Sequence, residues 1–126
     1  MILEYELSEE NAKLCGLEDG EEIYYCLPLD IDLEGGYRSN SYTVMTNRRL
    51  LILEEGKLTQ WYPLEKCDSI HSRAQTACGI LFIEQGKEEI LLGRFMTEHL
   101  TKYSYLLRGM VVLRNLYGGI KSDSTI

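Results

Sequence analysis

The sequence is short of the residues that build metal sites and active centres. It holds only two histidines, His71 and His99, and its four cysteines stand singly at positions 15, 26, 67 and 78. Zinc sites usually draw their ligands from closely spaced pairs, and no Cys-x-x-Cys pair occurs here. Gly-x-Ser-x-Gly, phosphate-loop and His-Glu-x-x-His motifs are also missing from the sequence. We therefore expect no metal, no cofactor and no enzymatic activity in this chain.

Basic residues are scarce as well. The chain has 13 lysines and arginines against 20 aspartates and glutamates, which gives a net charge of −7. The closest pairing of basic residues is Arg48-Arg49. Nucleic-acid binders need a basic surface, and anionic membranes attract clusters of four to eight basic residues. We expect neither nucleic acid nor direct membrane binding.

No apolar run approaches the roughly 18 residues that a membrane-spanning helix needs. The segment Met1–Glu10 is acidic and has no basic region typical of a signal peptide. The 126 residues, 44% hydrophobic and 26% charged, are typical of one soluble domain with its own core. We expect a cytoplasmic chain with reduced thiols, because nothing in the sequence directs it elsewhere.

The pattern of the first two thirds of the chain predicts a short helix and then seven strands. Ser8 is a good helix N-cap and Gly16 a good C-terminal stop, so we expect a helix over 9–15. Glu55-Gly56 is typical of a tight hairpin turn. Apolar residues alternate along each predicted strand, and turn residues separate one strand from the next. Pro28 indicates a strand edge or a bulge. The expected strands are 22–32, 42–46, 50–54, 57–62, 67–72, 79–85 and 88–94.

After residue 94 the hydrophobic period changes to that of a helix, which we expect over 97–117. Its core face combines apolar residues at helical spacing, among them Leu100, Tyr103 and Leu107 at the centre. A helix of about 20 residues could close one end of a bent seven-stranded antiparallel sheet. The sequence thus predicts a mainly β fold, a pleckstrin-homology-like (PH-like) barrel of seven antiparallel strands capped by one C-terminal helix. This domain would span residues 1–117, and 118–126 would form a flexible tail or linker.

A second apolar stripe on this helix, Tyr105, Val112 and Leu116, points away from the predicted core. Helices that are apolar on two sides are usually covered on two sides, although scattered exposed hydrophobic residues are common. Two interpretations of the stripe stay open. It contacts another protein surface, either another domain or a second copy of the chain, or it is ordinary exposed surface. The stripe is our putative partner contact.

Other polar residues have simpler interpretations. His71 and His99 lack sequence-adjacent carboxylate or cysteine partners, so we expect structural or solvated histidines. Asp30 and Asp32 share one strand face and could bind a cation, but we expect them to keep a strand edge solvated and unpaired. Arg38 faces several acids in its loop, and Arg48-Arg49 would lie at the opposite end of the barrel. These arginines therefore do not form one phosphoinositide site, and we expect Arg48-Arg49 to form a solvated turn.

The order of several segments resembles the N-terminal cytosolic domain of certain bacterial ABC exporters. The segment Val44–Gly56 also resembles the strand-turn-strand signature of bacterial PH-like domains. The resemblance covers about residues 9–117, and each motif alone is short. The further matching segments are Gly20–Ile23, Leu29–Gly35, Tyr62–Leu64, Gly93–Met96 and Tyr103–Gly109.

The resemblance implies a non-catalytic accessory or regulatory domain that contacts the rest of a transporter on the cytosolic side of the membrane. Transport and ATP hydrolysis would belong to the parent protein, because these residues contain no phosphate loop. The alternative, from a different class, is a stand-alone PH-like binding module for a lipid or a peptide.

Overall fold

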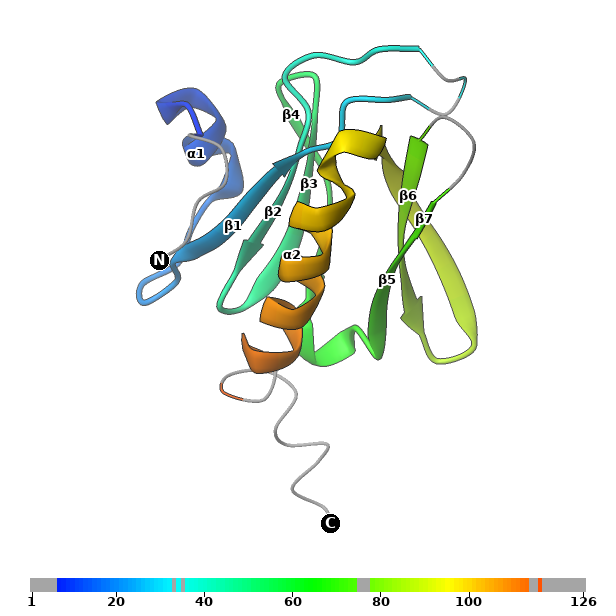
Figure 1. Ribbon diagram of the computed structural model, residues 1–126. Coiled ribbons are helices and arrows are strands. Elements are labelled where there is room, and N and C mark those ends of the chain that lie inside the picture. Colours follow the sequence, from blue (N-terminus) through cyan, green and yellow to red (C-terminus); the bar gives the residue numbers. More distant parts are fainter. Residues whose placement is uncertain (1–6, 33, 35, 75–77, 114–115, 117–126) are drawn as a thin grey trace.

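Seven strands and two α-helices make up the described part of the chain, in the order that the sequence predicts (Figure 1). The computed structural model describes residues 7–32, 34, 36–74, 78–113 and 116. The elements are α1 (Glu9–Cys15), β1 (Ile23–Pro28), β2 (Tyr42–Thr46), β3 (Arg49–Glu54), β4 (Lys57–Pro63), η1 (Leu64–Lys66), β5 (Ser69–Ala74), β6 (Cys78–Gln85), β7 (Glu88–Met96), η2 (Thr97–His99) and α2 (Leu100–Leu113).

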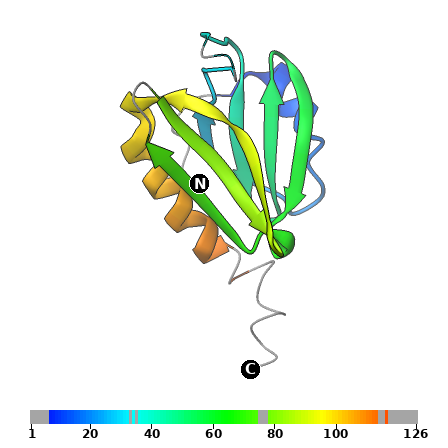
Figure 2. The same ribbon diagram turned by 90° about the vertical axis from the view of Figure 1, so that its right-hand side faces the viewer.

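The strands form two antiparallel sheets rather than the single seven-stranded barrel that we expected. One sheet has the order β1-β2-β3-β4 and the other β5-β6-β7. Between the two, the described residues show one isolated bridge, from Ile31 to Arg94. Because η1 alone joins β4 to β5, the two sheets splay apart, and α2 lies along the opening between β1 and β5 (Figures 1 and 2).

Local chemistry accounts for most of the element boundaries. Ser8 caps α1, since its hydroxyl accepts a hydrogen bond from the backbone N–H of Asn11 at 3.2 Å. Gly16 ends the helix in a left-handed conformation, φ 57°. Glu55 and Gly56 both have positive φ, 48° and 81°, which suits the tight hairpin between β3 and β4. The helix predicted over 9–15 and this hairpin are confirmed.

The main core fills the space between the two sheets and α2. Its centre is a stacked aromatic pair, Phe95 on β7 and Tyr103 on α2, with ring centroids 3.9 Å apart. The Tyr103 hydroxyl donates to the carbonyl of Pro28 at 2.8 Å and lies 3.0 Å from the hydroxyl of Thr43. Gly79 on β6 has no side chain, and a Cβ at this position would collide with the Phe95 ring. Both aromatic residues are fully buried, so α2 is an integral wall of the core.

The predicted core face of α2 is rotated slightly from the observed one. Tyr103 and Leu106 are fully buried, whereas Leu107, expected at the centre, is only partly buried against the core. The helical part is also shorter than 97–117, because Thr97–His99 is a 3-10 turn and α2 proper begins at Leu100. Residues 114, 115 and 117–126 lie outside the described part of the chain, so the predicted tail stays a prediction.

A second, smaller core lies on the outer face of the four-stranded sheet, where α1 covers it. The sequence did not predict this layer. It contains Cys15 of α1 and Cys26, Val44, Leu51 and Leu53 of β1 to β3. A register shift between Ile23 and Tyr25 changes the face of the sheet toward which the following β1 side chains point. Consequently Ile23 packs in this outer core and Tyr25 against the main one, although the sequence pattern placed them on the same face.

The two thiols of the outer core should be chemically inert. Burial raises the pKa of the Cys15 thiol to about 11 and that of Cys26 to about 12, and Cys67 and Cys78 are buried too. Because the thiolate is the reactive form, we expect almost no labelling of the folded chain by a disulfide reagent at neutral pH. All four cysteines should react in denaturant. Rapid labelling of the native chain, followed by peptide mapping, would show that α1 does not cover the sheet.

Within the described residues, none of the helices combines the length and the apolar character that crossing a membrane requires.

Candidate functional site

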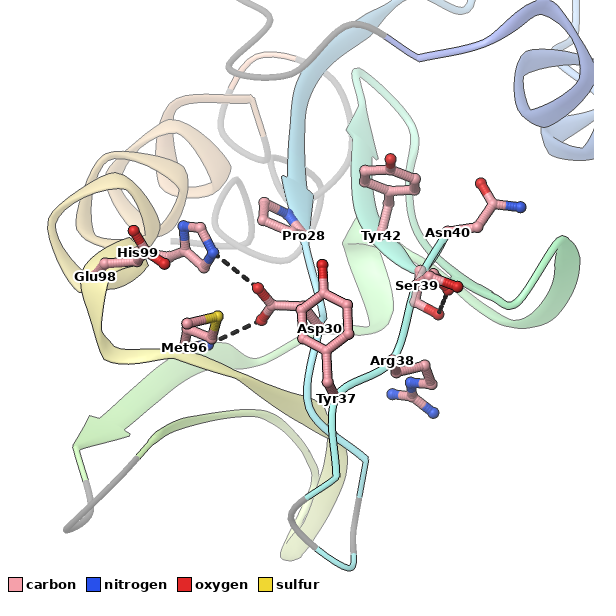
Figure 3. Close-up of a pocket in the computed structure, with 11 residues that line it drawn as sticks. Pro28, Asp30, Tyr37, Arg38, Ser39, Asn40, Tyr42, Met96, Glu98 and His99 are labelled. Atoms are coloured by element: carbon pink, nitrogen blue, oxygen red, sulfur yellow. Dashed lines mark hydrogen bonds and ion pairs between the residues drawn. The ribbon is translucent and has the colours of Figure 1, made fainter.

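A cleft of about 330 Å³ opens between the β1–β2 loop and the start of α2 (Figure 3). Tyr37 to Tyr42 form one wall, and Met96, Glu98 and His99 form the other. In the loop that leads to this wall, Asp32 accepts hydrogen bonds from the N–H groups of Glu34 and Gly36. This turn holds Tyr37 at the rim, where 74% of its surface is exposed.

Asp30 lies at the base of the cleft and is buried, whereas we expected it to lie at a solvated strand edge. The strand β1 ends at Pro28, and Asp30 then turns toward α2. One carboxylate oxygen accepts from the N–H of Met96 at 2.9 Å, and the other lies 3.0 Å from Nε2 of His99. Asp30 therefore ties the end of β1 to the first turn leading into α2. Its neighbour Asp32 serves the loop turn, so the two carboxylates do not converge.

Several polar groups of this cleft are engaged in structural contacts. The Ser41 hydroxyl donates to the Ser39 carbonyl and accepts from the N–H of Glu55. Arg38 forms an ion pair with Glu54 at 3.2 Å instead of facing the cleft as a free cation. Among the described residues, no group of three or more His, Cys, Asp or Glu side chains could hold a metal.

Arg49 also has a structural role that the sequence did not predict. Its guanidinium contacts both carboxylate oxygens of Glu21 at 2.9 Å and the Cys15 carbonyl at 2.9 Å. Thr46 donates a further hydrogen bond to Glu21 at 2.6 Å. A cation at the C-terminus of α1 interacts favourably with the helix dipole. The solvated turn expected for Arg48-Arg49 is therefore wrong for Arg49, which fixes α1 on the sheet.

A second cleft, of about 410 Å³, lies beside this ion pair. Trp61 lines it, half exposed, with the guanidinium of Arg49 5.3 Å from the ring centroid. Arg48 also lines it and donates to the carbonyl of Asp19 at 3.1 Å. Two acids, Glu18 and Glu65, offset the positive charge of the arginines here. The cleft thus combines an aromatic surface with mixed charge and shows no concentrated anion site.

Both histidines have carboxylate partners that are distant in sequence, so the expected structural role fits their contacts. Nε2 of His71 lies 2.7 Å from Oε1 of Glu84 and 2.8 Å from the Ser69 hydroxyl. Ser69 donates to the same Glu84 oxygen at 2.8 Å. Hydrogen bonds from Ser69 and His71 lower the pKa of Glu84. Because Ser69 and His71 on β5 both contact one carboxylate oxygen of Glu84 on β6, the arrangement bridges two strands and differs from a catalytic triad.

The outer face of α2 exposes apolar side chains that no described element covers. The predicted stripe is exposed: Tyr105 by 53%, Val112 by 57% and Leu116 by 62%. On the opposite side of the same helix, Tyr103 and Leu106 are fully buried. The helical phase predicted from the sequence is therefore right for this stripe, and what covers it stays a prediction.

Comparison with known proteins supports the fold. No family model matches the chain, and no curated protein matches it. One solved structure is similar: a DUF1696 family protein with a pleckstrin-homology domain from Shewanella loihica PV-4. The match has a TM-score of 0.60 at 14% sequence identity and covers 85% of this chain and 98% of the other. The chain therefore has a PH-like fold of two antiparallel sheets and a C-terminal helix.

Proposed function

We propose that this chain is a non-catalytic accessory domain of a bacterial ABC exporter and acts by protein–protein contact through the outer face of α2. One observation carries the proposal: Tyr105 and Val112 of α2, and Leu116 beyond its end, are exposed while the other side of the helix completes the core. Large exposed apolar side chains gathered on one element are typical of interaction surfaces. Tyr105 is the expected anchor, because tyrosine combines a large contact area with a polar tip.

The structural role of the remaining polar groups supports a binding rather than a catalytic function. Asp30, Glu21 and Arg49 are occupied by contacts within the fold. A PH-like neighbour supports the general class of binding module, and the exporter assignment depends on the resemblance of the segment order between residues 9 and 117. The acidic balance of the chain argues for a protein partner rather than a phosphoinositide.

Photo-crosslinking in the producing cell tests this proposal directly. A benzoylphenylalanine at position 101, one helical turn before Tyr105 and exposed, would lie beside the stripe without replacing it. We expect ultraviolet light to join the chain to the ATP-binding or membrane portion of an ABC exporter, identified by mass spectrometry. Val112→Asp or Leu116→Asp should abolish this product, because each places a charge in the apolar contact.

The matched control is Leu91→Asp, which removes an exposed leucine of β7 on another part of the surface. This variant should leave the crosslink at position 101 unchanged, and thermal unfolding should show that all the variants are folded. A crosslink that survives both α2 substitutions, or one that joins the chain to proteins unrelated to ABC exporters, would refute the proposal.

The cleft beneath Tyr37 favours a second candidate, a stand-alone module that binds a peptide. Its volume is near the lower end for ligand pockets, and Tyr37 offers an exposed ring at the rim. Arg38 is paired with Glu54, and Glu98 lines the cleft, so a phosphate headgroup would find little attraction there. A crosslinker at position 37 distinguishes the two candidates. Products from position 37 without products from position 101 would favour the peptide module.

A further inference from the structure

Positive charge is concentrated on the C-terminal helix of an otherwise acidic chain. Between His99 and Leu116 the sequence contains Lys102, Arg108 and Arg114 and no aspartate or glutamate. The rest of the chain holds ten basic and twenty acidic residues. Within its observed bounds, Leu100–Leu113, α2 carries Lys102 and Arg108 and no acid, so its charge is opposite to that of the whole molecule.

Arg108 brings this charge onto the outer face itself. The residue is exposed, and its guanidinium lies 5.8 Å from the centroid of the Tyr105 ring. Arg108 is one turn after Tyr105 and one turn before Val112, so the residue lies between two members of the stripe along the helix. Tyrosine and arginine are both enriched at binding hot spots. The outer face of α2 thus combines apolar contact area with a cation that can pair with a carboxylate.

From this charge pattern we infer that the partner segment is an apolar surface bordered by aspartate or glutamate side chains, with a carboxylate that pairs with Arg108. This inference rests on the proposed function and adds the chemistry of the partner. Two copies of the chain packed α2 to α2 would place like charges together, which disfavours that dimer. An anionic membrane would attract the helix but repel the acidic remainder of the chain, and three basic residues are fewer than such surfaces usually require.

Charge reversal at Arg108 tests the inference in the same crosslinking experiment. With the crosslinker at position 101, Arg108→Glu should reduce the yield of the protein adduct at least about threefold, because it replaces attraction by repulsion across the contact. Arg108→Lys should retain part of the yield. The crosslinked peptide, sequenced by mass spectrometry, should contain aspartate or glutamate near the attachment point.

Lys87→Glu is the matched control, because it makes the same charge change in the exposed β6–β7 turn. This variant should leave the yield unchanged. A product that Val112→Asp abolishes but Arg108→Glu leaves intact would overturn the acidic partner while the proposed function stands. If the chain with the crosslinker at position 101 and no other substitution gives no crosslinked product, both the inference and the proposed function are overturned. A crosslink to the same chain, or binding to phosphatidylserine vesicles that Arg108→Glu abolishes, would replace the acidic protein partner by a second copy or a membrane.

Discussion

Leu106→Ala should lower the free energy of unfolding by about 2–5 kcal/mol, the range for removing a fully buried leucine from a packed core. Leu106 has no exposed surface and packs in the main core with Phe95 and Tyr103. Its truncation would leave a cavity beneath α2, between the two sheets, where rigid strands on both sides limit collapse. Urea unfolding followed by circular dichroism or Trp61 fluorescence measures the change.

The adjacent residue provides the control for this prediction. Leu107 is only partly buried, so Leu107→Ala should cost about 1 kcal/mol, since less of its surface leaves water on folding. Equal losses for the two variants, or a larger loss for Leu107→Ala, would show that α2 is rotated from the orientation described above.

Glu21→Gln should be nearly as damaging, with a loss of about 3 kcal/mol, near the lower end for breaking a buried ion pair. The Glu21 side chain is completely buried and binds Arg49 and Thr46. Without its charge, the guanidinium of Arg49 would lose its partner while still largely enclosed. The neighbouring Glu22→Gln, on an exposed side chain, should change the stability by less than about 0.5 kcal/mol.

The same carboxylate predicts a pH dependence. Burial alone would raise the pKa of Glu21, but hydrogen bonds from Arg49, Thr46 and the Glu18 N–H outweigh it and hold the pKa below its usual value. A group whose pKa is lowered in the folded state stabilises the fold above its unfolded pKa, about 4.3 for glutamate. That stabilisation is lost as the pH falls through the folded value. Between pH 7 and pH 3, Glu21→Gln should therefore flatten the fall in stability. A parallel fall in both proteins would contradict this role for Glu21.

Local signals in the sequence were sufficient for the elements but not for their assembly. The Ser8 cap and the Glu55-Gly56 turn depend on neighbouring residues, and each corresponds to an observed boundary. The alternation predicted every strand, but it carried the first one to residue 32, whereas β1 ends at Pro28. The division into two sheets depends on which strand edges meet in space. Nothing in the residues of β4 and β5 signals that η1 would separate them. The outer core was missed because a helix of seven residues carries too little periodicity to show which face it packs on.

The polar contacts show the same limit. Asp30 meets His99 and the N–H of Met96 across more than sixty residues, and Glu21 meets Arg49 across 28. A sequence search for adjacent partners cannot find such pairs. The exposed stripe of α2 was found because its three members share one helix, and helical spacing alone determines that they share a face. Long-range pairs need the fold, whereas a surface on a single element does not.

The position of α2 at the end of the described chain has a consequence for synthesis on the ribosome. This helix is translated after all seven strands and supplies Tyr103 and Leu106, without which the space between the sheets is open. Until those residues emerge from the ribosome, the apolar side chains between the two sheets are exposed to solvent. Such exposed apolar surface binds chaperones and promotes aggregation. Partial products that stop before Leu100 should therefore be removed by proteolysis rather than accumulate as folded intermediates. The fold becomes stable only when α2 has been made.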